Sequence, residues 1–291
     1  MQVLNEEADR TLRIIGKQLD LDVFPLVRSG GYVAPSSLTT YYTNRDKEQY
    51  DERSKSRGSA TGSRKGTTGG QGPAGGSGSA GKTESSVFTD LASAYCEQLD
   101  DIETAYPGLR VWQQPGGIWL LISAGLIRGS LITARFLVAV PFDDRVPMAW
   151  AFWGDGSWIG PRHTNFKDGS ICCMHIPDNT WAVGEPLVDL LDLFTLWAVR
   201  HLYVRLFGRW PGRQVAILRH ERLTEISDDE LCGCGSAIPY GACCKKDDLK
   251  RNKMYVAIEF VLYGRERAVP KCIWRFVNGQ SEPPQFDELD F

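Results

Sequence analysis

The sequence predicts an α+β fold in which an antiparallel meander of strands is flanked by helices and followed by a small cysteine-rich element. Apolar residues recur at helical spacing from Val87 to Ile102 and again from Leu187 to Leu206. Three strand-like apolar runs lie between these helices, separated by Gly, Asp and Pro turn signals: 117–124, 130–140 and 147–153. This order of elements predicts one sheet that buries at least one face against helices.

Both helices have recognisable ends. The first stops before Pro107-Gly108, and the second begins at Pro186 and ends at Gly208. The second helix has about 20 residues, so it would extend roughly 30 Å across one face of the sheet.

Composition divides the 291 residues into five regions. Residues 57–82 contain no large apolar side chain and hold ten of the 30 glycines, which predicts a disordered linker over about 51–84. The regions after it are a main domain at 85–225, the cysteine-rich element at 228–250 and a carboxy-terminal extension at 251–291.

The two ends of the chain carry weaker signals. Within residues 1–50, four apolar residues predict one amphipathic helix: Ala8, Leu12, Ile15 and Leu19. So short a segment cannot bury a core of its own, so we expect it to dock on the main domain or on a partner. In the extension, Pro270 and Gly279 bound a predicted short helix, and the acidic, proline-rich last residues are expected to be loose.

Charge and hydropathy exclude several classes of function. A net charge of −3 offers no broad basic field for phosphates, so nucleic-acid binding is not indicated. No apolar run reaches the roughly 18 residues needed to span a bilayer, and the start of the chain lacks the features of a secretory signal. A cytoplasmic protein is expected.

The cysteine-rich element has the spacing of a metal site. Cys232 and Cys234 are followed, after eight intervening residues, by Cys243 and Cys244, which offers four thiolates for tetrahedral zinc. Protein ligands would fill all four positions, so the zinc would be structural. Two disulfides are the alternative, and a reducing compartment disfavours them. The element resembles the SEC-C motif, including Cys-Gly-Ser after the first pair and Tyr240 before the second, without the lysines usual around that aromatic residue.

The segment 163–181 contains a candidate nucleophile. Asp168-Gly169-Ser170 is a turn sequence, and it places Cys172 just after a loop, where a thiol can be accessible. Other notable positions in the same run are His163, Asn165, Ile171 and Trp181.

This run resembles the active-site segment of ubiquitin-conjugating enzymes, in which His-Pro-Asn precedes a Gly-x-Ile-Cys turn and a tryptophan follows. The resemblance covers about residues 85–215 and implies the ubiquitin-conjugating fold. It implies that Cys172 carries an acyl group as a thioester. It also implies that Asn165 stabilises the oxyanion or orders the loop, and that His163 has a structural role.

The resemblance is incomplete. Thr164 stands where the family has proline, and the acidic residue that prepares the incoming lysine has no match, so amine activation is unassigned. The neighbouring Cys173 and the later Trp181 are expected to pack inward. His201 is expected to be buried or at a boundary, and His220 solvated.

The expected function is therefore that of a transferase. Cys172 would accept a ubiquitin-like modifier, or another protein carboxy terminus, from an activating enzyme and pass it to an amine on a protein target. Gly208-Arg209-Trp210-Pro211-Gly212 and the SEC-C element resemble bacterial conjugating-enzyme relatives from anti-phage operons, which implies antiviral defence and makes a synthase carboxy terminus a possible modifier.

Two alternatives stay open. One is a non-catalytic adaptor with the same fold that binds a modifier or partner protein. The other is a thiol hydrolase that pairs Cys172 with His163 or His175, which requires a histidine within hydrogen-bond reach of the sulfur.

Overall fold

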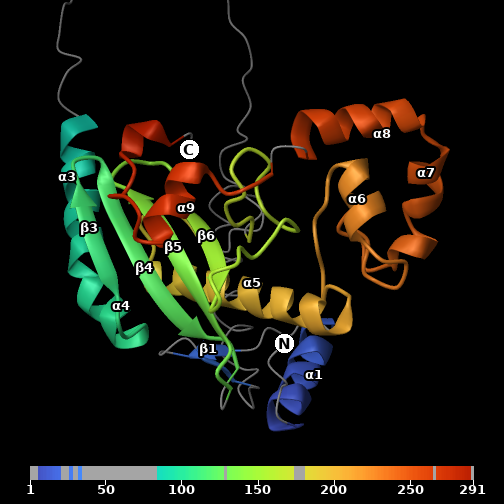
Figure 1. Ribbon diagram of the computed structural model, residues 1–291, viewed down its shortest axis with the longest axis horizontal. Helices are drawn as coiled ribbons and strands as arrows, with labels where there is room; N and C mark the ends of the chain where they lie inside the picture. The colour runs from blue at the N-terminus through green and yellow to red at the C-terminus, as the bar shows by residue number, and fades with distance from the viewer. Residues whose placement is uncertain are drawn as a thin grey trace, which may run out of the picture.

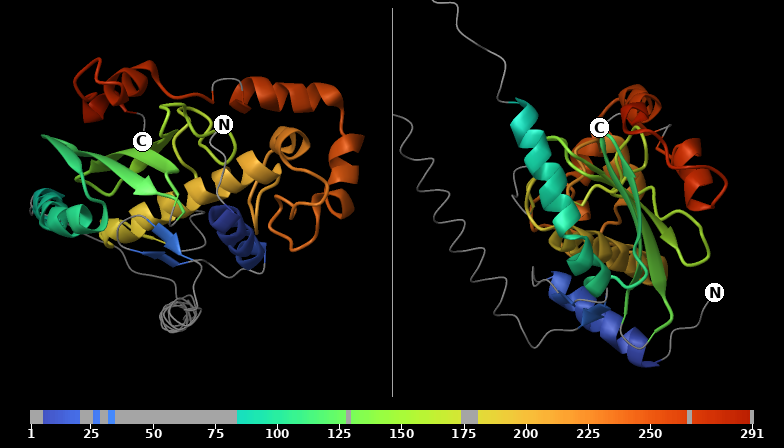
Figure 2. Two further views of the ribbon diagram at one scale, coloured as in Figure 1. Left: turned by 60° about the horizontal axis from the view of Figure 1, so that its bottom comes forward. Right: turned by 90° about the vertical axis from the view of Figure 1, so that its left-hand side faces the viewer.

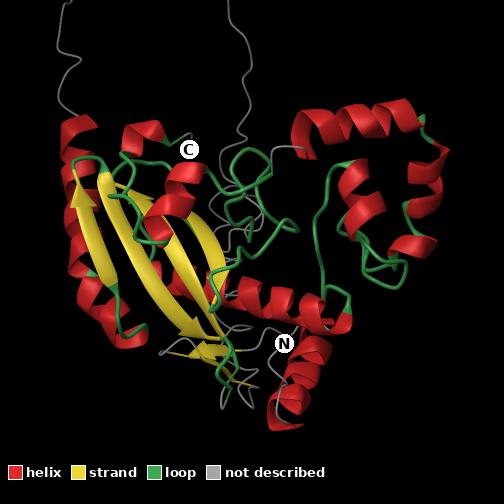
Figure 3. Cartoon of the chain, viewed as in Figure 1, coloured by secondary structure: helices red, strands yellow, loops and turns green. Residues whose placement is uncertain are grey.

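A four-stranded antiparallel sheet forms the centre of the protein (Figure 1 and Figure 3). The computed structural model describes residues 6–20, 26–28, 32–34, 84–127, 130–173, 181–264 and 267–289. The sheet order is β3-β4-β5-β6, and the strands are Arg110–Gln114, Gly117–Gly125, Thr133–Pro141 and Met148–Trp153. The predicted α+β class and the antiparallel meander are confirmed. The first strand, β3, was not predicted, because its polar residues interrupt the apolar signal.

The central strands send alternate side chains to two faces of the sheet, and both faces contain buried residues. On β4, Ile118, Leu120 and Ile122 belong to the main core, whereas Trp119 belongs to a second cluster on the opposite side. This period of two means that both faces need a cover.

Helices α3 (Glu84–Glu97), α4 (Leu99–Ala105) and α5 (Leu187–Phe207) contribute to the main core. Helix α5 ends as predicted, since Gly208 adopts φ +73° and its N–H bonds to the Val204 carbonyl at 2.8 Å. The first predicted helix is broken at Gln98 into α3 and α4. The side chain of Gln98 accepts a hydrogen bond from the Leu187 N–H at 2.7 Å, so it satisfies a backbone donor at the start of α5.

The amino-terminal helix α1 (Glu6–Asp20) docks on the main domain (Figure 2). All four residues of its predicted apolar stripe are buried in the main core: Ala8, Leu12, Ile15 and Leu19. Gly16 lies against the Tyr203 ring of α5, where a Cβ would come within 2.2 Å of the ring. A small antiparallel pair, β1 (Leu26–Arg28) and β2 (Tyr32–Ala34), follows. The predicted linker lies outside the described residues.

The carboxy-terminal extension covers the other face of the sheet. Helix α9 (Lys271–Val277) lies between Pro270 and Gly279 as predicted. Its Phe276 ring stands 5.8 Å from Trp119, edge to face, and the Trp119 indole donates to the Pro284 carbonyl at 3.1 Å. Phe286, which opens the 3-10 turn η4 (Phe286–Glu288), is 4% exposed. The expectation of a loose end was wrong for the described residues up to 289, because the large indoles of this sheet face require a cover.

The remaining helices form a separate lobe beyond the end of α5 (Figure 1). They are α6 (Arg219–Glu225), η2 (Tyr240–Ala242), α7 (Lys245–Lys250), α8 (Lys253–Glu259) and the π-helical turn η3 (Phe260–Gly264). The lobe has a small core of its own around Ala216, Ile226, Cys232 and Tyr240. Among the helices that the structure describes, none combines the length and apolarity needed to cross a membrane.

A buried carboxyl on α5 makes stability depend on pH. Burial raises the pKa of Asp192 to about 7, although the hydroxyl of Tyr106 donates to its Oδ1 and opposes that rise. Folding therefore favours the protonated carboxyl. The contribution of Asp192 to stability falls as the pH rises from about 4, the unfolded value, to about 7, and is constant above that.

We expect Asp192→Asn to make the free energy of unfolding depend less on pH. The side-chain amide oxygen of this variant can still accept a hydrogen bond from Tyr106. Between pH 5 and pH 8 the free energy of unfolding of the wild type should fall more than that of the variant, by about 2.5 kcal/mol. Urea denaturation at the two pH values measures it, with Asp100→Asn, an exposed aspartate of α4, as the control. Parallel pH profiles for wild type and variant would contradict the assignment.

Candidate functional site

The segment from His163 to Cys172 is a tight loop closed by backbone hydrogen bonds. Thr164 and Ile171 form an isolated antiparallel bridge. Next to it, the Asn165 N–H donates to the Ser170 carbonyl at 2.8 Å, and the Cys172 N–H donates to the His163 carbonyl at 3.0 Å. The loop therefore sets Asn165 opposite Ser170 and Cys172 opposite His163.

The turn and the anchors of this loop follow from its sequence. Gly169 has φ +65°, a conformation that favours glycine, and a Cβ there would lie 2.8 Å from the Trp158 ring. Ile171 is 8% exposed, and its N–H bonds to the Ala149 carbonyl on β6 at 2.7 Å. The predicted turn is confirmed, and it is fixed to the sheet.

Cys172 lies exposed at the end of the loop, whereas Cys173 is partly buried against the main core. The inward packing expected of Cys173 is confirmed. Desolvation by the surrounding protein raises the pKa of the Cys172 thiol, the Glu221 carboxylate raises it further and Arg267 lowers it. The surroundings of Cys172 therefore disfavour the thiolate form of its side chain.

Asn165 is exposed, and its side chain is held by the loop. Its amide nitrogen donates to the Ser170 hydroxyl at 2.9 Å, and Ser170 is fully buried. A side-chain amide carries two N–H donors, and the Ser170 bond uses one of them. The arrangement can orient the second donor, which is what oxyanion stabilisation requires.

His163 is fixed in place by both its ring and its backbone. Its Nε2 lies 3.2 Å from the Gln214 Oε1, and its ring centroid lies 4.1 Å from that of Trp210. Its carbonyl accepts from the Trp197 indole at 3.0 Å, in addition to the Cys172 N–H. Burial and the nearby Arg162 charge hold the pKa of His163 well below its usual range. These contacts fit the structural role that the resemblance implies.

Two other aromatic positions agree with expectation. Trp181 is 7% exposed, and its indole donates to the Pro186 carbonyl at 2.9 Å, so it packs where α5 begins. His201 is also 7% exposed, and burial lowers its pKa to about 3.

Across the described parts of the chain, no hydrogen bond joins a histidine ring to the Cys172 sulfur. The pairing with His163 that a thiol hydrolase would use is therefore not formed. His175 lies outside the described residues.

A buried ion pair joins the loop to the cysteine lobe. Arg162, next to His163, contacts Glu230 through both terminal nitrogens, one of them at 3.1 Å. Gln214 receives an Arg162 N–H at 2.6 Å and donates to the Leu231 carbonyl at 2.7 Å. Glu230 also accepts the Trp210 N–H at 3.0 Å, and it is 1% exposed. This group of residues, here called the Arg162 bridge, ends one residue before Cys232.

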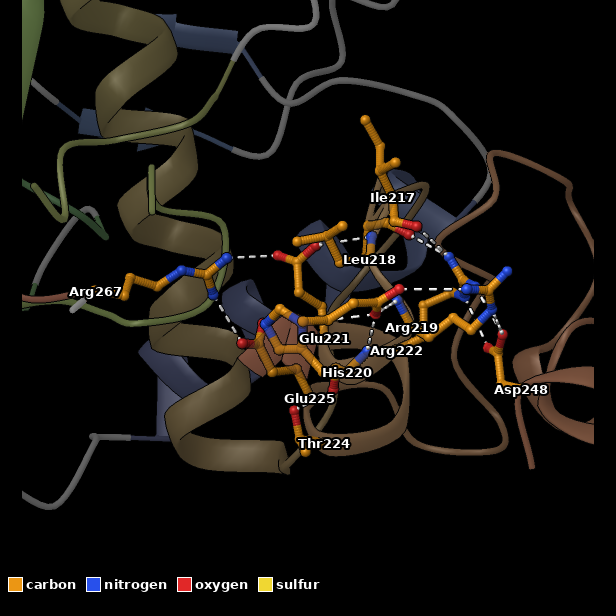
Figure 4. A network of polar contacts seen from close by, with 12 residues as sticks. Ile217, Leu218, Arg219, His220, Glu221, Arg222, Thr224, Glu225, Asp248 and Arg267 are labelled. Carbon is orange, nitrogen blue, oxygen red and sulfur yellow. Dashed lines mark hydrogen bonds and ion pairs between the residues drawn. The ribbon is translucent and has the colours of Figure 1, made fainter. Parts of the chain in front are cut away.

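A second ionic network joins α6 to the segment before α9 (Figure 4). Arg267 donates to Glu221 at 2.5 Å and to Glu225 at 2.8 Å, and its guanidinium lies 4.3 Å from the Phe166 ring of the loop. These contacts place charged groups of the lobe beside Cys172, in agreement with their effect on the pKa of its thiol.

His220 corrects an expectation, because it is 2% exposed rather than solvated. Its ring lies between the rings of Phe166 and Phe260, each at 6.0 Å. The burial of His220 could not be predicted from its neighbours, because they are charged: Arg219, Glu221 and Arg222. All three form ion pairs that exist only in the folded lobe.

The four cysteines of the lobe come together as predicted. The sulfurs of Cys232, Cys234, Cys243 and Cys244 all lie within 4.8 Å of one another. Cys243 Sγ is 3.6 Å from Cys234 Sγ and 3.8 Å from Cys244 Sγ, and all four thiols are free. Four sulfurs bonded at about 2.3 Å to one tetrahedral ion would lie about 3.8 Å apart. The cluster fits a metal ion.

Backbone contacts hold the cluster open for such an ion. The Cys232 N–H donates to the Ile238 carbonyl at 2.9 Å, and Cys234 pairs with Val215 as an isolated bridge. Behind it, Arg222 forms a bidentate pair with Asp248 at 2.7 and 2.8 Å, and the Tyr240 hydroxyl donates to the same carboxylate at 3.2 Å. The residues behind the cysteines are thus fixed by hydrogen bonds and an ion pair.

Sequence reasoning missed the residues that join the loop to the lobe: Arg162, Gln214, Glu221, Glu230 and Arg267. Each is a charged or polar residue of a type usually found in solvent, at an isolated position. Only contact between distant segments shows that they are buried.

Comparison of the chain with protein-family models, with curated proteins and with solved structures found no match. The site is therefore interpreted from its own geometry.

We expect Glu230→Ala to destabilise the protein by about 3–5 kcal/mol, because it leaves the buried Arg162 charge without its partner. Urea denaturation measures the loss. Lys250→Ala, which breaks an exposed ion pair with Asp247, is the control and should change stability little. Equal effects of the two substitutions would mean that the Arg162 bridge contributes no more to stability than an exposed ion pair.

Proposed function

We propose that this protein is an acyl transferase of the ubiquitin-conjugating type that carries a protein carboxy terminus as a thioester on Cys172. The observation that supports it most is the loop itself. It presents Cys172, an exposed residue, on the same loop as a side-chain amide that is held in place, with no bond from a histidine of the described residues. The chain order of helix, meander, loop and crossing helix α5 is also that of the ubiquitin-conjugating fold.

In the first step, the Cys172 sulfur attacks the carbonyl carbon of a thioester on an activating enzyme. A new C–S bond forms, the bond to the donor sulfur breaks, and the Cys172 proton leaves with the departing thiolate.

In the second step, an amine nitrogen of the target attacks the Cys172 thioester. Negative charge develops on the carbonyl oxygen, and the second N–H of Asn165 stabilises it, an effect worth about 3 kcal/mol for one such donor. The C–S bond then breaks, an amide forms, and the proton lost by the amine goes to the departing Cys172 thiolate. His163 holds the loop and transfers no proton.

The resemblance to ubiquitin-conjugating enzymes limits the classes of partner that we propose. They are an activating enzyme, a modifier that is a ubiquitin-like protein or the carboxy terminus of a synthase, and a protein target with an amine. The proposed setting is bacterial anti-phage defence in the cytoplasm. Nucleic acid and membrane are not proposed as partners.

The metal proposed for the cysteine cluster is zinc, in a structural role. Four thiolates suit zinc, and no ligand position is left for water. The ion would fix the residues around Cys232. The Arg162 bridge reaches from there to His163, so the same ion would support the loop that carries Cys172.

A non-catalytic adaptor is the second candidate. The raised pKa of the Cys172 thiol favours it, since a protonated thiol is a weaker nucleophile. The adduct experiment below separates the two.

With activating enzyme and modifier present, we expect wild-type protein to form an adduct that a thiol reductant cleaves. Cys172→Ser should form an ester that resists reductant and yields to mild base. Non-reducing electrophoresis and mass spectrometry detect both, and Cys173→Ser should behave as wild type. Undiminished adduct on Cys172→Ala would reject the carrier role, and no adduct on the wild type would favour the adaptor.

The proposed role of Asn165 predicts that its substitution slows the second step and not the first. Asn165→Ala should leave formation of the thioester nearly unchanged and slow transfer to an amine about 100-fold, the usual effect of losing one oxyanion donor. Single-turnover discharge of the purified thioester measures the second step alone. If discharge proceeds at the wild-type rate, Asn165 does not stabilise the oxyanion.

Metal analysis of the purified protein should find about one zinc per chain, since four thiolates saturate one ion. Cys234→Ser should lose the metal and lower the melting temperature, because binding free energy contributes to folding. Cys272→Ser, an exposed cysteine outside the cluster, is the matched control and should keep both. Equal metal content in the two variants would rule out the cluster as the site.

A further inference from the structure

Helix α8 and the turn η3 lie on the outside of the lobe (Figure 1 and Figure 2), and they expose apolar side chains. Met254, Tyr255 and Leu262 are 61%, 62% and 66% exposed, and Ile258 and Val261 are exposed as well. These five residues follow the i, i+1, i+4, i+7, i+8 spacing of a single helix face. They are here called the α8 stripe, and none of them is an acidic or basic residue.

The opposite side of the same helix is already occupied. Glu259 accepts the Arg219 N–H at 3.0 Å, Phe260 lies beside His220, and the Tyr263 ring is 6.0 Å from that of Phe166. These contacts orient the helix and leave the α8 stripe facing away from the protein. A helix with apolar residues on both sides is normally covered on both sides.

The exposed area is large enough to need a stable partner. The five side chains of the α8 stripe present on the order of 500 Å² of apolar surface, more than half of the roughly 800 Å² that one partner contributes to a standard interface. Monomeric soluble proteins rarely expose apolar patches above a few hundred Å².

We infer that the α8 stripe is the interface of a two-fold symmetric dimer of this chain, in which the α8–η3 helices of two copies pack antiparallel. A closed two-fold contact is the commonest way for a soluble chain to cover such a surface, and a helix face lying on its own symmetry mate is self-complementary. This inference does not depend on the proposed transferase function.

Charge favours the antiparallel arrangement. Lys250, Arg251 and Lys253 lie at the start of α8, and the helix continues to Gly264. Twelve residues extend about 18 Å, so antiparallel packing keeps the cations of the two copies farther apart than the Debye length of about 8 Å. Parallel packing would set them side by side.

Charge also disfavours an anionic lipid surface as the occupant. Two of the five cations of this region are paired with carboxylates on the protein, Lys245 with Asp228 and Lys250 with Asp247. Recruitment by anionic lipid normally relies on clusters of four to eight uncompensated cations.

Sedimentation velocity of the 291-residue chain at micromolar concentration tests this inference. We expect the wild type to sediment as a dimer and the double variant Tyr255→Glu/Leu262→Glu as a monomer, with unchanged circular dichroism and metal content. Leu131→Glu, which adds charge at an 85% exposed leucine between β4 and β5, is the matched control and should remain a dimer.

Hydrogen exchange provides a second readout that needs no substitution. Amides from Lys253 to Tyr263 should become more protected as the protein concentration rises. A wild type that stays monomeric, or a double variant that stays dimeric, overturns the inference. A monomeric wild type that floats with phosphatidylserine vesicles would overturn it in favour of a lipid surface.

Discussion

The candidate site depends on the Arg162 bridge, a guanidinium and a carboxylate buried together between two parts of the chain. Removing both charges from water is costly, and the contact is stable only because each remaining polar atom of Glu230 finds a donor. Arg162, Gln214 and the Trp210 N–H all converge on that carboxylate. Since the partners come from the loop, from the end of α5 and from the cysteine lobe, none of the three can move without leaving an unpaired charge. This geometry gives the loop around Cys172 its fixed shape.

Buried ion pairs also explain why the cysteine lobe affects the pKa of the Cys172 thiol. Cys172 is offered by the sheet side of the protein, but the charges that act on it, Glu221 and Arg267, belong to α6 and to the segment before α9. They are held by each other and by Glu225, so their effect on the sulfur is built into the fold. The reactivity of Cys172 is therefore a property of the carboxy-terminal half as much as of the loop.

The two faces of the sheet are covered by segments that lie far apart in the sequence. One face is covered by α3, α4 and α5, with α1 packed on α5 in the same core, and the other by α9 and Phe286. Residues from both termini are thus core residues. Large side chains such as Trp119 and Trp150 are fully buried only because the end of the chain returns to them.

The sequence by itself determined the periodic and punctuated features: the helix of α5 between Pro186 and Gly208, the meander, the stripe of α1, the turn at Gly169 and the four clustered cysteines. Each is set by interactions between residues close in the chain, such as side-chain periodicity, backbone conformation or ligand spacing. Tertiary structure alone decided that α1 docks on α5, that the last residues cover the sheet, and that Arg162, Glu230 and His220 are buried. Those outcomes depend on contacts between segments far apart in sequence, for which a charged or polar residue type gives no local sign.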